Sequence, residues 1–143
     1  MRVMDILRHK GDDVTTISPN STLEEASRKL AFNGIGALVV STSGTSVQGV
    51  LFERDVVRHL ATVGRDGMDT MVADVMTRAE TCSPSDSVED LMRLMTDRRL
   101  RHVPVMVNGQ LCGIVSIGDV VKRRLDHLEN ERHQLQMYIQ TGR

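Results

Sequence analysis

The sequence predicts an α/β (α+β) fold in which a β-α-β-β-α unit occurs twice and is followed by a long C-terminal helix. The first observation is an internal repeat, because Ser18-Pro19 recurs as Ser83-Pro84 65 residues later. The second is that Asp55 and Asp119 each stand between an apolar strand-like run and a helix-like run, 64 residues apart. The third is that 40% of the 143 residues are hydrophobic, enough for a packed core. We expect the two units to pack as a pseudo-twofold pair, since a unit of about 55 residues is marginally stable alone.

The chain divides into a first unit, a linker, a second unit and a helical extension, at residues 1–61, 62–71, 72–124 and 125–143 respectively. The two units open alike, since Val3 to Leu7 matches Val72 to Met76. The first unit carries about four extra residues near Lys10 to Asp13, and their composition is that of a surface loop.

Each unit then predicts a helix. In the first, Ser21 with Glu24, or Thr22 with Glu25, has the spacing of a capping box. Asn33-Gly34 ends this helix, because both residues tolerate the left-handed conformation of a C-terminal cap. In the second, Asp86 and Ser87 provide the equivalent start.

A β-hairpin follows each helix. Apolar runs predict its strands at residues 37–40 and 47–52 in the first unit, and at 103–107 and 111–116 in the second. Asn108-Gly109 is a strong signal for a two-residue hairpin turn. Pro104 places its strand at an edge or a strand end, because proline donates no ladder hydrogen bond. With a short strand before each helix, both units read strand, helix, strand, strand, helix.

A long helix is predicted from Val120 onward. Its apolar positions recur at alternating intervals of four and three residues, with a basic interruption at Arg132: Val121, Leu125, Leu128, Arg132, Leu135 and Ile139. This heptad seam could pack back on the domain or pair with a second subunit. We favour self-association, because the other faces of the helix are polar.

Composition argues against several functional classes. The net charge is −1 and aromatic residues make up 2%, which argues against nucleic-acid binding despite the basic runs Arg98 to Arg101 and Lys122 to Arg124. Cys82 and Cys112 read as buried thiols of a reducing compartment, without zinc-ligand spacing. No signal peptide or membrane-length apolar run is present, so we expect a cytoplasmic protein.

The strand-to-helix joints carry the chemistry. A hydroxyl and a carboxylate three residues apart, Ser116 and Asp119, suit a polyol such as ribose, and the helix N-terminus beside them suits phosphate. At the other joint Asp55 is preceded by Phe52, which has no hydroxyl. The alternative is that both aspartates only stabilise helix N-termini.

The repeated order, with Arg101-His102-Val103-Pro104-Val105, Gly113 to Asp119 and Glu53-Arg54-Asp55, resembles a tandem CBS domain pair (a Bateman module) of the small stand-alone bacterial type. The resemblance implies a regulatory module without enzymatic activity. It implies clefts between the repeats that bind adenosyl ligands without a covalent bond: AMP, ADP, ATP, NAD(H) or S-adenosylmethionine. It also implies homodimers. Since no effector domain is present in this sequence, we expect an effector protein that responds in trans.

In the family pattern, the hydroxyl and the Asp of [Ser/Thr]-x-x-Asp hold phosphate and ribose. Ser116 and Asp119 match this pattern. Phe52, three residues before Asp55, stands in place of the hydroxyl and could instead pack against an adenine ring. The full set of candidate ligand-binding residues is Thr16, Gly36, Ala37, Arg54, Asp55, Arg101, His102, Val103, Pro104, Ser116 and Asp119.

Several of these candidates have alternative roles. Arg54 could bind a ligand phosphate or pair with Glu53 or Asp55. His102 could bind phosphate or adenine, or be a satisfied, partly buried histidine. Arg98, Arg99 and Arg101 form a solvated turn or a funnel for phosphate, and Gly36-Ala37 and Val103 offer backbone groups to adenine. We find no nucleophile–base pair and no metal-ligand set, so an enzyme is not expected. The remaining alternative is a structural or dimerisation protein with vestigial clefts.

Overall fold

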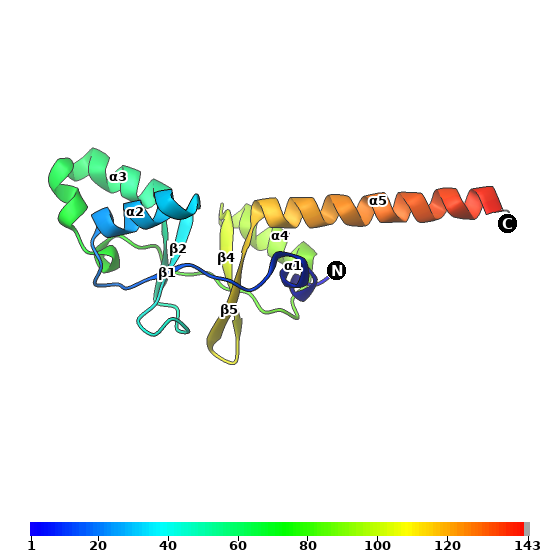
Figure 1. The fold of residues 1–143 in the computed structure, drawn as a ribbon, viewed down its shortest axis with the longest axis horizontal. Helices are drawn as coiled ribbons and strands as arrows, with labels where there is room; N and C mark the ends of the chain where they lie inside the picture. The colour runs from blue at the N-terminus through cyan, green and yellow to red at the C-terminus, as the bar shows by residue number, and fades with distance from the viewer. Residues whose placement is uncertain (142–143) are drawn as a thin grey trace.

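The computed structural model describes residues 1–141, and within that range the chain forms five α-helices, five strands and two short 3-10 helices (Figure 1). In chain order the elements are α1 (Val3–Lys10), β1 (Thr16–Ile17), α2 (Leu23–Asn33), β2 (Ala37–Val40), β3 (Gly49–Phe52), α3 (Glu53–Val63), η1 (Arg65–Asp69), η2 (Val72–Asp74), α4 (Val88–Asp97), β4 (His102–Val107), β5 (Gln110–Ser116) and α5 (Ile117–Thr141). The predicted tandem α/β architecture with a long C-terminal helix is confirmed. The end of the predicted extension, residues 142 and 143, lies outside the described residues.

The first unit contains a three-stranded sheet in the order β1-β2-β3. β1 runs parallel to β2, and β2 runs antiparallel to β3 with Ala37 opposite Phe52. The start and end of α2 follow from local chemistry: Thr22 Oγ1 accepts a hydrogen bond from Glu25 N at 3.2 Å, and Gly34 has φ 62°. The sequence therefore located α2 correctly, with Thr22 as the capping residue.

The second unit differs from the prediction in its first strand. Cys82 makes a single parallel bridge to Val105, so the sheet contains only β4 and β5. Pro104 explains the loss. In the first unit Val39 N donates to Thr15 O at 3.3 Å, and Pro104, at the equivalent position, has no N–H to donate. Pro104 is paired with Ile114 inside β4, and β4 is an edge strand of its two-stranded sheet, as the first of the two predicted alternatives requires.

The opening segment of each unit packs in the hydrophobic core of the other unit. Val3 and Ile6 of α1 are buried in the core of the second unit, beside Val88 and Leu91. Val72 of η2 is buried in the core of the first unit. Backbone hydrogen bonds fix both exchanges, for example Val3 N to Asp86 O at 2.9 Å and Val72 N to Ser21 O at 2.8 Å. This exchange brings α1 next to the second strand-to-helix joint.

The predicted linker, residues 62–71, is helical over most of its length, because α3 continues to Val63 and η1 covers Arg65–Asp69. Gly67 of η1 is buried, and a Cβ there would lie 3.0 Å from the His59 ring of α3. α5 begins at Ile117, three residues earlier than predicted, directly after β5. Figure 1 shows that α5 then leaves the rest of the molecule and projects to the C-terminus.

Candidate functional site

Two strand-to-helix joints have equivalent backbone geometry. At the first, between β3 and α3, Phe52 N donates to Asp55 Oδ2 at 2.9 Å. At the second, between β5 and α5, Ser116 N donates to Asp119 Oδ2 at 2.8 Å. The first residue of each following helix also donates to the residue just before the first hairpin strand: Glu53 N to Gly36 O, and Ile117 N to Arg101 O.

The second joint is a complete capping box. Asp119 N donates to Ser116 Oγ at 3.1 Å, while the Asp119 carboxylate accepts from Ser116 N. The first joint has only the carboxylate half, because Phe52 offers no side-chain acceptor. Phe52 instead lies in the core with 6% of its surface exposed. As predicted, Asp119 has a hydroxyl partner three residues earlier and Asp55 does not, and only the helix at Asp119 has a side-chain acceptor at its N-cap.

A cation already contacts Asp119. Lys10 Nζ lies 2.6 Å from Asp119 Oδ2 and donates to Ile114 O at 2.6 Å. Burial alone would raise the pKa of Asp119, but the hydrogen bonds from Lys10 and Ser116 outweigh burial and lower it below the usual 3.8. Lys10 was predicted to open a surface loop. It is instead the last residue of α1, and only Gly11, Asp12 and Asp13 form an exposed loop.

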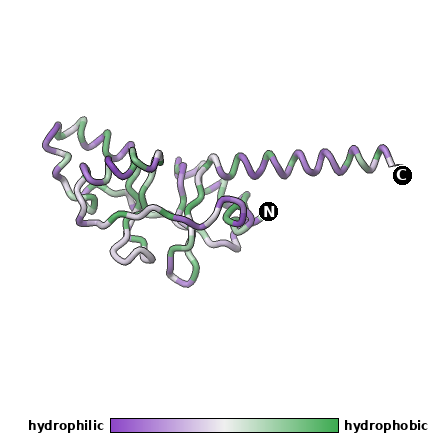
Figure 2. The backbone as a smooth tube through the Cα atoms, in the orientation of Figure 1, coloured by the Kyte–Doolittle hydropathy of each residue, from purple (hydrophilic) through white to green (hydrophobic). Residues whose placement is uncertain are grey.

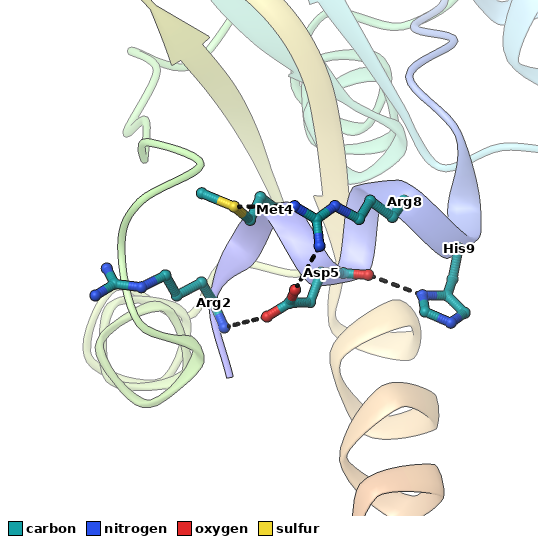
Figure 3. A network of polar contacts seen from close by, with 5 residues as sticks. All are labelled: Arg2, Met4, Asp5, Arg8 and His9. Atoms are coloured by element: carbon teal, nitrogen blue, oxygen red, sulfur yellow. Dashed lines mark hydrogen bonds and ion pairs between the residues drawn. The ribbon is translucent and has the colours of Figure 1, made fainter.

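A polar network orders the helix that carries Lys10 (Figure 3). Asp5 accepts from Arg2 N at 2.8 Å and from the Arg8 guanidinium at 3.5 Å, and its backbone carbonyl lies 3.0 Å from His9 Nδ1. The backbone hydrogen bond from Arg2 is the main reason that the pKa of Asp5 is lowered. These contacts join residues within α1 and its N-cap, while the buried Val3 and Ile6 pack α1 against the second unit and so hold Lys10 in place.

The first joint has a neutral partner in the equivalent place. Thr77 Oγ1 donates to the Asp55 carboxylate at 3.1 and 3.2 Å. The Thr77 backbone pairs with Val50 through two hydrogen bonds of 2.9 Å, along the β3 edge that corresponds to Ile114 in β5. Lys10 and Thr77 thus occupy matching positions at the two joints.

Neither Lys10 nor Thr77 was predicted as a site residue. Both follow the opening segments that the two units exchange, so each reaches the carboxylate of the other unit. The matched openings Val3 to Leu7 and Val72 to Met76 were the sequence signal that could have identified these two residues. Each opening packs on the other unit, and the polar residue that follows it is therefore placed beside the other unit's joint.

Each joint is bordered by a cavity, and the two cavities differ in charge. The cavity beside the second joint, called the Asp119 cavity, has a volume of about 510 Å³ and is lined by Ile6, His9, Lys10, Asp119, Lys122, Arg123 and Asp126. The cavity beside the first joint, called the Asp55 cavity, has a volume of about 290 Å³ and is lined by Asp55, Arg58, His59, Thr62, Asp74 and Val75. Lysine and arginine outnumber carboxylates in the Asp119 cavity, and carboxylates outnumber them in the Asp55 cavity.

A third cavity lies between the units and gathers several predicted residues. This inter-repeat cavity, of about 290 Å³, is lined by Gly36, Phe52, Glu53, Arg54, Arg101 and His102. The Arg54 guanidinium carbon lies 4.9 Å from the centre of the Phe52 ring, and Arg54 Nη1 donates to Arg99 O at 3.3 Å. Within residues 1–141 no ion pair joins Arg54 to Glu53 or Asp55, so this alternative is not what the structure shows.

His102 links the cavity to the second joint. It pairs in register with Ser116, and its ring lies 6.3 Å from that of Phe52. Its Nδ1 is buried without a hydrogen-bond partner among the described residues. Burial and, secondarily, the charge of Lys10 lower the pKa of His102, against the opposing influence of Asp119 and Glu53. The predicted alternative of a satisfied histidine therefore does not hold for Nδ1.

The remaining candidates lie in the strands. Thr16 pairs with Val39, and its carbonyl accepts from Lys29 Nζ at 2.6 Å. The side chains of Ala37, Val103 and Pro104 are buried, so they could offer a ligand only backbone groups. None of these four lines the three cavities described above. Arg98, three residues before Arg101, forms an ion pair with Glu80, with Nε and Oε1 3.9 Å apart.

Within residues 1–141, no group of three or more His, Cys, Asp or Glu side chains is placed to hold a metal ion. The helices of the same range include none with the length and apolar character needed to cross a bilayer. Cys82 is buried, which raises its pKa to about 12.

Comparison with known proteins identifies the family. The CBS domain model matches residues 3–62 and again residues 72–126. The chain is a CBS domain protein. The mitochondrial CBS domain-containing protein CBSX3 of Arabidopsis thaliana is 34% identical over 149 residues, covering 98% of this chain and 72% of that protein. As a CBS domain pair, the chain is a regulatory module.

Solved structures of CBS domain proteins have the same fold. The CBS-domain containing protein ATU1752 from Agrobacterium tumefaciens superposes with a TM-score of 0.83 at 42% identity, covering 87% of this chain and 99% of that one. The CBS domain pair of protein MJ0100, solved with 5′-methylthioadenosine and S-adenosyl-L-methionine, superposes with a TM-score of 0.77 at 22% identity, covering 89% of this chain and 98% of that one. The predicted family and fold are both confirmed.

Proposed function

We propose that this protein senses adenosyl nucleotides in the clefts of its CBS pair and acts on an effector protein in trans. The observation that supports this most directly is the inter-repeat cavity, whose lining comes from both units. A ligand that contacts both units can favour one relative arrangement of them over another. It shifts that equilibrium only by the difference between its affinities for the two arrangements.

The cavity lining suits a nucleotide. Arg54 and Arg101 are guanidinium groups that can bind phosphate through two parallel hydrogen bonds. Phe52 lines the cavity, but its ring is largely buried and Arg54 lies over it, so a base would reach the ring only by displacing the Arg54 side chain. The unpartnered Nδ1 of His102 can pair with a ligand oxygen or nitrogen, since a buried polar atom normally has such a partner.

The second joint would supply the sugar contact. Ser116 and Asp119 stand at the N-terminus of α5, and their capping bonds leave the second carboxylate oxygen of Asp119 available to ribose hydroxyls. Lys10 would stay beside the ligand as a phosphate contact. The excess of lysine and arginine in the Asp119 cavity favours a ligand with phosphate groups, such as AMP, ADP, ATP or NAD(H), over S-adenosylmethionine.

The protein would work as a homodimer, with ligand binding changing a surface that the effector reads. The competing hypothesis is a dimerisation protein with vestigial clefts. Two observations favour it: Phe52 lacks the hydroxyl of the family pattern, and Asp55 and Asp119 already have protein partners. The two hypotheses differ in whether the protein responds to nucleotides at all.

A thermal-shift panel with AMP, ATP, NADH and S-adenosylmethionine tests the proposal. A ligand at 100 times its dissociation constant adds about 2.7 kcal/mol to the free energy of unfolding, a readily visible shift. Arg101→Ala should reduce the shift, because it removes a cation from the inter-repeat cavity. Arg98→Ala is the matched control, an arginine in the same turn that does not line the cavity. No shift with any ligand would favour the dimerisation hypothesis.

A further inference from the structure

The C-terminal helix presents an apolar seam that nothing in the described chain covers. Val120 is the only residue of α5 that is fully buried. By contrast, Leu125 is 57% exposed, Leu135 63% and Ile139 76%. Figure 2 shows hydrophobic and hydrophilic positions alternating along the whole projecting part of α5.

The projecting part needs a partner to be stable. Every residue from 128 to 141 is exposed, and Leu128 itself has 46% of its surface exposed. An isolated helix of this length is marginal in water, because tertiary packing supplies most helix stability. The seam keeps an average spacing of 3.5 residues from Val121 to Leu135 and continues to Ile139, which is the repeat of a two-stranded coiled coil.

The heptad places charged residues beside the seam in a complementary order. With Leu128 and Leu135 at d positions, Arg124 and Glu131 fall at g positions and Glu129 at an e position. In a parallel pair, a g residue faces the e residue of the next heptad on the other helix. Arg124 of each helix then faces Glu129 of the other. Arg132 lies beside Arg132 of the other helix, and the flanking Glu131 side chains offset the repulsion between these two arginines.

The antiparallel alternative places like charges together. Aligning the same seam in the opposite direction brings Glu129 opposite Glu129 of the second copy, and Glu131 opposite Glu131. Like charges at these flanking positions disfavour that orientation. Charge complementarity therefore distinguishes the two arrangements.

We propose that α5 pairs with α5 of a second copy of this chain as a parallel two-stranded coiled coil along Val121, Leu125, Leu128, Arg132, Leu135 and Ile139. This inference rests on the proposed homodimer and assigns its interface. Arg124, which lies 3.8 Å from Glu89 of its own chain, would exchange that exposed contact for Glu129 of the second copy. Both second joints would then lie at the same end of the dimer, because Ser116 and Asp119 cap the start of α5.

Charge-swap variants of the full chain test the register by analytical ultracentrifugation. Glu129→Arg places two arginine pairs in contact and should weaken dimerisation by about tenfold, since two exposed ion pairs become repulsive. The double variant Arg124→Glu with Glu129→Arg should restore the wild-type dissociation constant. Asn130→Arg is the matched control, because position 130 faces away from the seam.

Cross-linking tests the orientation independently of affinity. In a parallel pair, Leu135→Cys brings two thiols together and should form a disulfide-linked dimer under mild oxidation, whereas Gln134→Cys should not. A monomer at all concentrations would contradict the homodimer itself. A dimer unaffected by Glu129→Arg, or one in which Leu135→Cys links only to Leu125→Cys, would keep the homodimer and overturn the parallel coiled coil.

Discussion

The two strand-to-helix joints share a backbone but differ in the partner of their carboxylate. At the second joint Asp119 accepts from the ammonium of Lys10 and is capped by Ser116. At the first joint Asp55 accepts from the neutral hydroxyl of Thr77, and the position of the cap is filled by buried Phe52.

This difference shows how a duplicated fold can diversify two sites. Both aspartates keep the bond to the last strand residue, because that bond stabilises the helix start. The residues that set the local charge come from the exchanged opening segments, outside the repeated joint. We infer that the second joint contacts the ligand, through the Asp119 carboxylate and the neighbouring Lys10, while the first joint is chiefly structural.

The largest expected effect comes from making the first joint resemble the second. Phe52→Ser supplies the missing hydroxyl but removes a buried ring, and we expect a loss of about 3 kcal/mol in the free energy of unfolding. Ser116→Ala at the second joint should cost only about 1 kcal/mol, the usual contribution of a helix cap. Urea denaturation measures both. Equal losses would mean that Phe52 is not needed by the core.

A smaller effect is expected from neutralising each carboxylate. Asp119→Asn keeps a capping side chain but removes the charge that Lys10 contacts, and should cost about 1–2 kcal/mol, since the pair is partly exposed. Asp55→Asn has no lysine opposite and should cost less than about 1 kcal/mol.

The pH dependence of these two variants checks the interpretation. Because the pKa of Asp119 is lowered in the folded state, the stability it provides is present above the usual value of 3.8 and is lost as pH falls below it. Asp119→Asn should therefore flatten the acid limb of the stability curve more than Asp55→Asn. Identical acid limbs would contradict the assignment of the charged partner to the second joint.

The smallest effect concerns His102, whose counterpart in the first unit is Ala37. Its pKa is lowered on folding, so the unfolded chain binds the proton first and stability should fall as pH decreases below 6.5. His102→Ala should remove this slope between about pH 7 and pH 5. His133→Ala, on the exposed part of α5, is the control. A slope that survives in His102→Ala would assign it to another group.

Local chemistry made much of the fold predictable. Thr22, Gly34 and the Asn108-Gly109 turn specify their elements through nearby backbone atoms, and each was located correctly. Pro104 was identified as an edge or strand-end residue. Its consequence, that Cys82 forms a single bridge and not a strand, could not be predicted without knowing that the segment of Cys82 lies beside Pro104 and Val105. The sequence predicted a linker at residues 62–71 but not its helical conformation, which is accompanied by packing of Gly67 against α3.

The candidate site was predictable only in part. The joints follow from a repeat visible in the sequence, and Arg54, Arg101 and His102 do line one cavity. Lys10 could not be assigned, because its contact with Asp119 joins residues 109 positions apart. That contact depends on α1 packing against the second unit, a feature of tertiary structure that no local pattern specifies.

Isothermal titration of ATP into Lys10→Met and Thr77→Val variants tests the central claim most directly. The account predicts that Lys10→Met weakens binding by about tenfold, the value of one charge-assisted hydrogen bond to phosphate, while Thr77→Val stays within about twofold of wild type. The opposite order would place the phosphate at the first joint. Unchanged binding in both variants would contradict a functional difference between the two joints.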